Sequence, residues 1–76
     1  MAESLALIEQ TIRTFKANDV GPTHVGTALV LRGKIFDRAQ NPQAAVRDWR
    51  DARAIFVAAY GTQDDRVLEL TKLLAR

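Results

Sequence analysis

Apolar residues recur three and four positions apart through most of this 76-residue chain, and this spacing restricts its fold more than any other feature. In the first segment, the series runs through Leu5, Ile8, Ile12 and Phe15. At 3.6 residues per turn, these intervals place the side chains on one face of a helix. No segment alternates apolar and polar residues over the length of a strand. The spacing therefore predicts an all-α fold.

Turn-forming residues divide the chain into four predicted helices. The stretches "NDVGPT", "NP" and "GTQDD" separate them, and such short connections make neighbouring helices antiparallel. Asn41 followed by Pro42 is the clearest start, because Asn is a good N-cap and Pro suits the first helical position. The helices are predicted from about Glu3 to Ala17, Thr23 to Gln40, Pro42 to Tyr60, and from Thr62 onward.

Cap residues are predicted at three further places. Thr23 is expected to cap the second helix, and Gly61 is expected to end the third in a left-handed conformation. Thr62, with an acid three residues later, forms a variant of the capping box. Asp64 and Asp65 then lie at the positive end of the fourth helix, so capping explains these two carboxylates better than acid catalysis does.

One stripe of each helix is expected to form the core. Gly33 interrupts the second stripe, and an interior glycine most often lets another helix come close. Arg32 is the one charged member of that stripe. After the first helix, the stripes comprise Val25, Ala28, Leu29, Arg32, Ile35, Phe36 and Ala39; Ala45, Trp49, Ala52, Phe56 and Ala59; and Val67, Leu70, Leu73 and Leu74.

The stretch "NPQAAVRDWRDARAIF" places arginines around Trp49 and raises the question of nucleic-acid binding. Helical geometry predicts instead that Trp49 points inward, while Arg47 and Arg50 lie on the opposite side beside Asp51. Arg47 and Asp51 are four residues apart, a spacing that favours an ion pair. A stacking platform for bases needs an exposed aromatic ring, so core packing is the preferred interpretation of Trp49.

Composition narrows the possible functions. There is no cysteine, His24 is the only histidine, and the net charge is only +2, so neither a metal site nor a dedicated nucleic-acid binder is expected. No catalytic or phosphate-binding motif occurs, so we expect neither an enzyme nor a bound cofactor. No apolar run approaches a membrane span and "MAESLALIEQ" does not resemble a signal peptide. A cytoplasmic domain covering residues 1–76 is expected.

The segment "GKIFDRAQNPQAAVRDWRDARAIF" resembles a tetratricopeptide repeat (TPR). Gly33 and Phe36 match the family's small-then-aromatic spacing, and Ala45, Trp49 and Ala52 match its second helix. The longer link "YGTQDDRV" is similar to the kinesin-light-chain variety. Arg32 departs from the pattern, since the family prefers leucine there. The resemblance covers residues 24–60 and implies TPR-like helix–turn–helix hairpins, beginning in the middle of a repeat.

The resemblance also implies a function, which is binding a peptide or helix along the face formed by the first helix of each repeat. The Lys34–Arg38 and Lys72–Arg76 pairs, each four residues apart, suit an acidic segment or a C-terminal carboxylate. Ordinary solvated charges are the competing interpretation. When the chain is aligned with the repeat pattern, this face corresponds to Thr27, Val30, Lys34, Asp37 and Arg38 on the second helix, and to Glu69, Lys72 and Arg76 on the fourth.

The sequence leaves three classes of function open. The leading hypothesis is a non-catalytic, TPR-type protein–protein interaction module. The second is a small self-associating bundle, a homodimer, because Leu7 and Leu68 lie away from the apolar stripes of their helices. The third is weak nucleic-acid binding through the arginines of the third helix. The chain is expected to be an excised piece of a longer repeat array, a divergent bundle that stands alone, or a unit that a partner completes.

Overall fold

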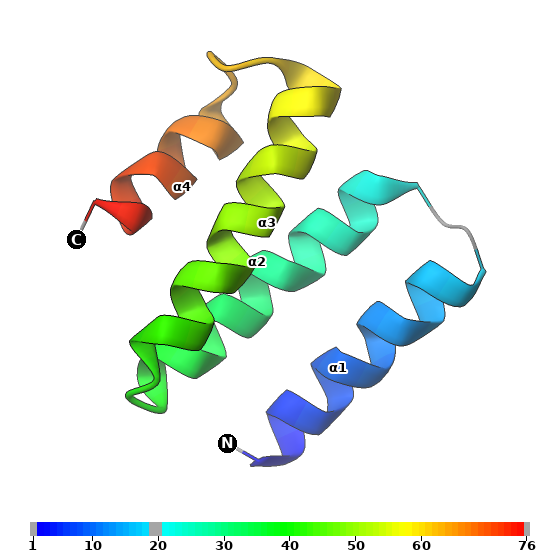
Figure 1. The fold of residues 1–76 in the computed structure, drawn as a ribbon. Coiled ribbons are helices and arrows are strands. Elements are labelled where there is room, and N and C mark those ends of the chain that lie inside the picture. Colours follow the sequence, from blue (N-terminus) through cyan, green and yellow to red (C-terminus); the bar gives the residue numbers. More distant parts are fainter. Residues whose placement is uncertain (1, 19–20, 76) are drawn as a thin grey trace.

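The computed structural model describes residues 2–18 and 21–75, with side chains from Ser4 onward within those ranges. It contains four helices, α1 (Ala2–Ala17), α2 (Pro22–Arg38), α3 (Pro42–Tyr60) and α4 (Asp65–Leu74). The described ranges contain no strand. Helices adjacent in sequence run antiparallel (Figure 1). The all-α, four-helix prediction is therefore confirmed.

The start of α3 agrees with the prediction, whereas the start and the end of α2 do not. The Asn41 side chain accepts a hydrogen bond from the Ala44 N–H at 3.4 Å, and Pro42 is the first helical residue. In α2, Gly21 takes the N-cap position and Pro22 is the first helical residue, since its fixed φ suits that position. Thr23 is therefore not the N-cap. The helix also stops before Gln40, whose φ of 61° is left-handed.

The start of α4 also differs from the prediction. Asp64 is the N-cap, because its carboxylate accepts the Arg66 N–H at 2.9 Å, so the Thr62 capping box is wrong. Asp65 is the first helical residue, which confirms that both carboxylates lie at this helix end. Gly61 has a positive φ of 90°, but its ψ of 169° is extended rather than left-handed helical.

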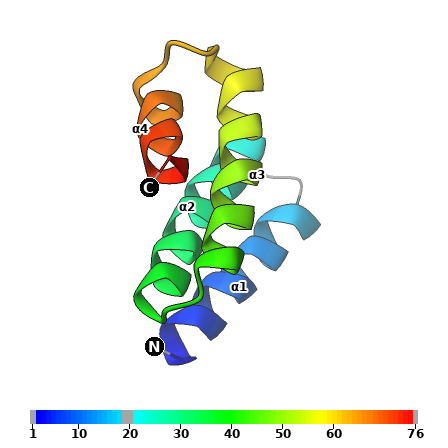
Figure 2. The same ribbon diagram turned by 60° about the vertical axis from the view of Figure 1, so that its left-hand side comes forward.

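The four helices form a flat slab of 34 × 33 × 15 Å. Helices α2 and α3 pack most extensively, α1 packs on α2, and α4 packs on α3 (Figures 1 and 2). In the described ranges, each helix packs only on its neighbours in sequence. A hydrogen bond of 2.9 Å from Arg53 Nε to Thr71 Oγ1 adds to the contact between α3 and α4. The outer helices are thus each covered by a single neighbour.

Trp49 lies in the middle of the core and is 3% exposed, as predicted. Its ring occupies the space left by Gly33, where a Cβ would lie 2.6 Å from the indole Cδ1. The indole N–H donates to the carbonyl oxygen of Val30 at 3.3 Å. Ala39 and Ala59, predicted inside, are exposed because they lie at helix ends. The buried apolar residues are Ile12, Val25, Ala28, Leu29, Ala45, Trp49, Ala52, Phe56, Val67 and Leu70.

Candidate interaction surface

A groove of about 240 Å³ lies between α2 and α4 and is called here the α2–α4 groove. Because α4 packs on α3 rather than on α2, the space between α2 and α4 is only partly filled, and Phe56 of α3 lines it. The described residues of its walls are mostly apolar, with one cation and one carboxylate among them. The lining residues are Thr27, Val30, Leu31, Phe56, Arg66, Glu69, Leu70 and Leu73.

A second groove of about 410 Å³ runs between α1 and α2 and is called here the α1–α2 groove. The described residues that line it include no carboxylate, and the two charged residues among them, Lys34 and Arg38, are both exposed cations. Leu31 lines both grooves and is 50% exposed, so the two hollows meet at its side chain. The lining residues are Ser4, Leu7, Ile8, Thr11, Leu31, Lys34, Ile35 and Arg38.

The predicted binding residues divide between these grooves. Thr27 and Val30 of α2 line the α2–α4 groove together with Glu69 of α4, although about 40 residues of sequence separate them. Lys34 and Arg38 lie in the α1–α2 groove instead.

The remaining predicted binding residues do not share these two hollows. Asp37 is half-buried and Lys72 is exposed, and neither lines either groove. Arg76 lies outside the described residues. The structure thus brings together part of the predicted set and shows two separate hollows.

Both cations of the α1–α2 groove lack ion-pair partners among the described residues, whereas Arg66 in the α2–α4 groove is engaged. The ion pairs among the described residues join Arg32 to Asp48 and Arg66 to Asp64. The Arg66 guanidinium also lies 4.2 Å from the centre of the Tyr60 ring. Lys34 and Arg38 are therefore the cations available to a charged partner in the two grooves.

Sequence reasoning missed the ion pair between Arg32 and Asp48. Two hydrogen bonds, of 2.8 and 2.7 Å, join the guanidinium to the carboxylate, which is only 2% exposed. The hydrogen bonds that Arg32 donates to the Asp48 carboxylate raise the pKa of Arg32, although burial opposes the shift. Because folding raises the pKa of this base, the ion pair stabilises the folded state fully at pH values below the ordinary pKa of arginine. That stabilisation is lost only when the pH rises through the raised pKa. The lone charge in the apolar stripe of α2 was the signal for a buried partner.

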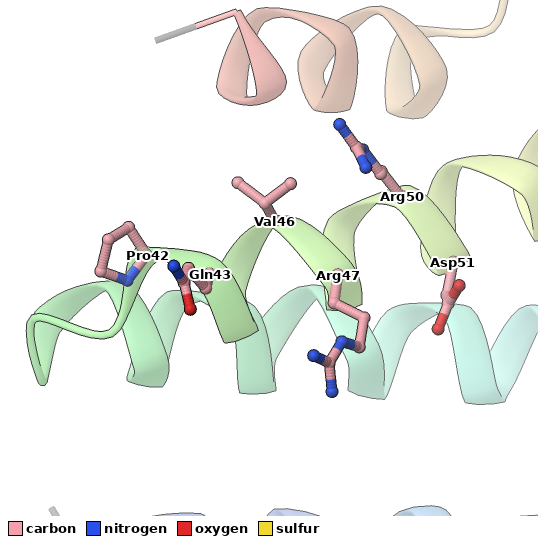
Figure 3. A pocket seen from close by; sticks show the side chains of 6 residues that line it. All are labelled: Pro42, Gln43, Val46, Arg47, Arg50 and Asp51. Carbon is pink, nitrogen blue, oxygen red and sulfur yellow. The ribbon is translucent and has the colours of Figure 1, made fainter.

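The outer face of α3 carries an open hollow of about 490 Å³ lined by Pro42, Gln43, Val46, Arg47, Arg50 and Asp51 (Figure 3). Arg47 and Arg50 extend to opposite sides of the helix (Figure 3). The predicted Arg47–Asp51 ion pair is absent from the ion pairs that the described residues form. Trp49 is buried on the other face, as predicted, so this hollow has no aromatic ring on which a base can stack.

The described residues offer no group of three or more His, Cys, Asp or Glu side chains placed to hold a metal ion. His24 is exposed, with its ring 5.9 Å from that of Phe15. Within the same ranges, none of the helices is both long enough and apolar enough to cross a membrane.

Comparisons of the chain with models of protein families, with curated proteins and with solved structures find no match.

Proposed function

We propose that this chain is a non-catalytic protein–protein interaction module of TPR type that holds a peptide or a helix in the α2–α4 groove. The observation that carries the proposal is that Thr27, Val30 and Glu69 line one groove. The resemblance to the repeat family selected these three residues from two separate helices, and the packing of the chain gives them a common hollow.

The chemistry of the groove suits a short segment with both apolar and polar side chains. Phe56, Leu70 and Leu73 supply apolar walls, while Thr27 and Glu69 supply polar groups at the surface. Apolar walls with a few placed polar groups are typical of sites that bind ligands and peptides. With a groove of about 240 Å³, we expect a few anchoring side chains rather than an extensive interface.

A displayed random-peptide library, selected on the intact chain, tests the proposal. The affinity of an enriched peptide is then measured by titration against Thr27→Arg, which places a long side chain in the groove. Ala54→Arg is the matched control, since Ala54 is exposed on α3 and lines neither groove. We expect Thr27→Arg to weaken binding at least about tenfold, or about 1.4 kcal/mol, and the control to leave it unchanged.

Two results contradict the proposal. One is that the chain enriches no peptide over a helical protein without a groove. The other is that Thr27→Arg and Ala54→Arg bind the selected peptide equally well, since the peptide would then lie elsewhere.

Partner class and location extend the same proposal. The acidic partner that the resemblance implies belongs to Lys34 and Arg38, which lie in the α1–α2 groove rather than in the groove proposed for the peptide. The cytoplasm is the expected compartment. A homodimer is compatible with this role, because Leu7 and Leu31 are exposed. Nucleic-acid binding is the weaker alternative. It is tested by titration with mixed DNA and RNA at low salt, where Arg47→Glu/Arg50→Glu would abolish any binding through α3.

A further inference from the structure

The α1–α2 groove combines an apolar floor with a positive edge that forms no ion pair with the described residues. Leu7 is 66% exposed and Leu31 50% exposed, which is high for large apolar side chains. Lys34 and Arg38 lie one helical turn apart on α2. Neither has an ion-pair partner among the described residues. An occupant of this groove therefore needs apolar side chains and two carboxylates about one turn apart.

The outward face of α4 has this combination. Val67 and Leu70 point into the core, which leaves Asp65 and Leu68 exposed on the other side, with Glu69 exposed at the edge that also lines the α2–α4 groove. Asp65 and Glu69 are four residues apart and have no ion-pair partner among the described residues. Leu68, between them in sequence, is 42% exposed.

We infer that the α1–α2 groove binds α4 of a second copy of this chain. Two carboxylates four residues apart on one helix have about the same separation, roughly 6 Å, as two cations four residues apart on another. The carboxylates of Asp65 and Glu69 thus meet Lys34 and Arg38, while Leu68 covers the exposed leucines of the groove. A net charge of +2 opposes the approach of two copies only weakly.

Charge reversal with complementation tests this interface by multi-angle light scattering at tens of micromolar protein. Wild type is expected to show a mass of at least two 8.5 kDa chains. Lys34→Glu/Arg38→Glu has an acidic groove and an acidic α4, and Asp65→Lys/Glu69→Lys has a basic groove and a basic α4. Each is expected to associate at least about tenfold more weakly, since attraction at two charge pairs becomes repulsion.

An equimolar mixture of the two variants is expected to recover the larger mass, because each then offers the charge that the other needs. Arg47→Glu/Arg50→Glu is the control. It changes the net charge by the same amount as Lys34→Glu/Arg38→Glu but lies on the outer face of α3, so it should associate like wild type. Circular dichroism checks that every variant remains helical.

Three results overturn the inference: a single-chain mass for wild type, variants that associate as well as wild type, or folded variants that fail to recover association when mixed. Lys34→Glu/Arg38→Glu separates this inference from the peptide proposal. Lys34 and Arg38 lie outside the α2–α4 groove, so this variant should still bind a selected peptide, whereas Asp65→Lys/Glu69→Lys also changes Glu69, which lines that groove.

Discussion

Gly33 is the residue at which one added methyl group should disturb the packing most. A Cβ there would lie 2.6 Å from Cδ1 of Trp49, and the rigid indole is held by a hydrogen bond to Val30. Overpacking costs about 1–3 kcal/mol, whereas alanine gains up to about 1 kcal/mol in helix propensity. Gly33→Ala should therefore lower the free energy of unfolding by about 1–2 kcal/mol, measured by urea denaturation.

Gly26→Ala is the matched control, because its Cβ would meet Phe56 Cζ at the milder distance of 3.1 Å. Its loss should be clearly smaller, and its tryptophan fluorescence should match that of wild type. Equal losses at both positions would show that contact with the indole is not the cause.

Asp48 is expected to matter through its charge partner. Asp48→Ala leaves the Arg32 guanidinium, which is 24% exposed, without a carboxylate. Removing one partner of a buried pair costs about 3–5 kcal/mol, and partial exposure of the guanidinium reduces the expected loss to about 2–3 kcal/mol.

The double variant Arg32→Met/Asp48→Leu should unfold with a free energy within about 1 kcal/mol of wild type, because neither charge is then left unpaired. Thermal and urea unfolding of both variants check this. A double variant no more stable than Asp48→Ala would mean that the ion pair itself, rather than the unpaired charge, accounts for the loss.

For single residues, the sequence predicts burial correctly where the position of the side chain follows from helical spacing. Ala45, Trp49, Ala52 and Phe56 are all buried, as predicted. Asp48 was missed because spacing assigns a charged residue to solvent, and only a partner on another helix reverses that assignment. The partner becomes visible only once α2 and α3 are packed together.

Individual helices depend on caps that residue type alone does not identify. Thr62 and Asp64 both precede α4, and both are good N-cap residues. The structure selects Asp64, whose carboxylate binds the Arg66 N–H at 2.9 Å and also pairs with the Arg66 side chain. Asp64→Ala should therefore lower the free energy of unfolding by about 1 kcal/mol, measured by thermal denaturation.

Thr62→Ala should change the free energy of unfolding by less than about 0.5 kcal/mol, since Thr62 is exposed and precedes the cap. If the threonine variant loses more stability than the aspartate variant, the capping box rather than Asp64 starts α4.

The existence and order of the helices were predictable because each helix has its own apolar stripe. Their ends were less predictable, because several residues near a boundary can serve as caps.

The grooves belong to the scale of the whole molecule, and the sequence could not place them. Register alone put Lys34 and Thr27 on one face, whereas the packing of α1 and α4 on different sides of the central pair separates them into two hollows. The angle at which helices pack depends on side chains from both partners, and this information is not local in sequence.

Because each described helix packs only on its neighbours in sequence, stability should be uneven along the chain. Helices α2 and α3 support each other, whereas α1 and α4 each pack on a single neighbour. Amide hydrogens in the middle of α2 and α3 should exchange only through global unfolding, and those of α1 and α4 through smaller openings. Hydrogen exchange monitored by NMR checks this order. Uniform protection in all four helices would contradict it.

Leu31 gives the two grooves a common wall, since it lines both and is half exposed. Occupants of the two hollows would therefore both contact this one side chain. By thermodynamic linkage, any effect of a peptide on assembly of the chain must equal the effect of assembly on peptide affinity. If filling one hollow turns Leu31 away from the other, peptide affinity would fall as the concentration of the chain rises.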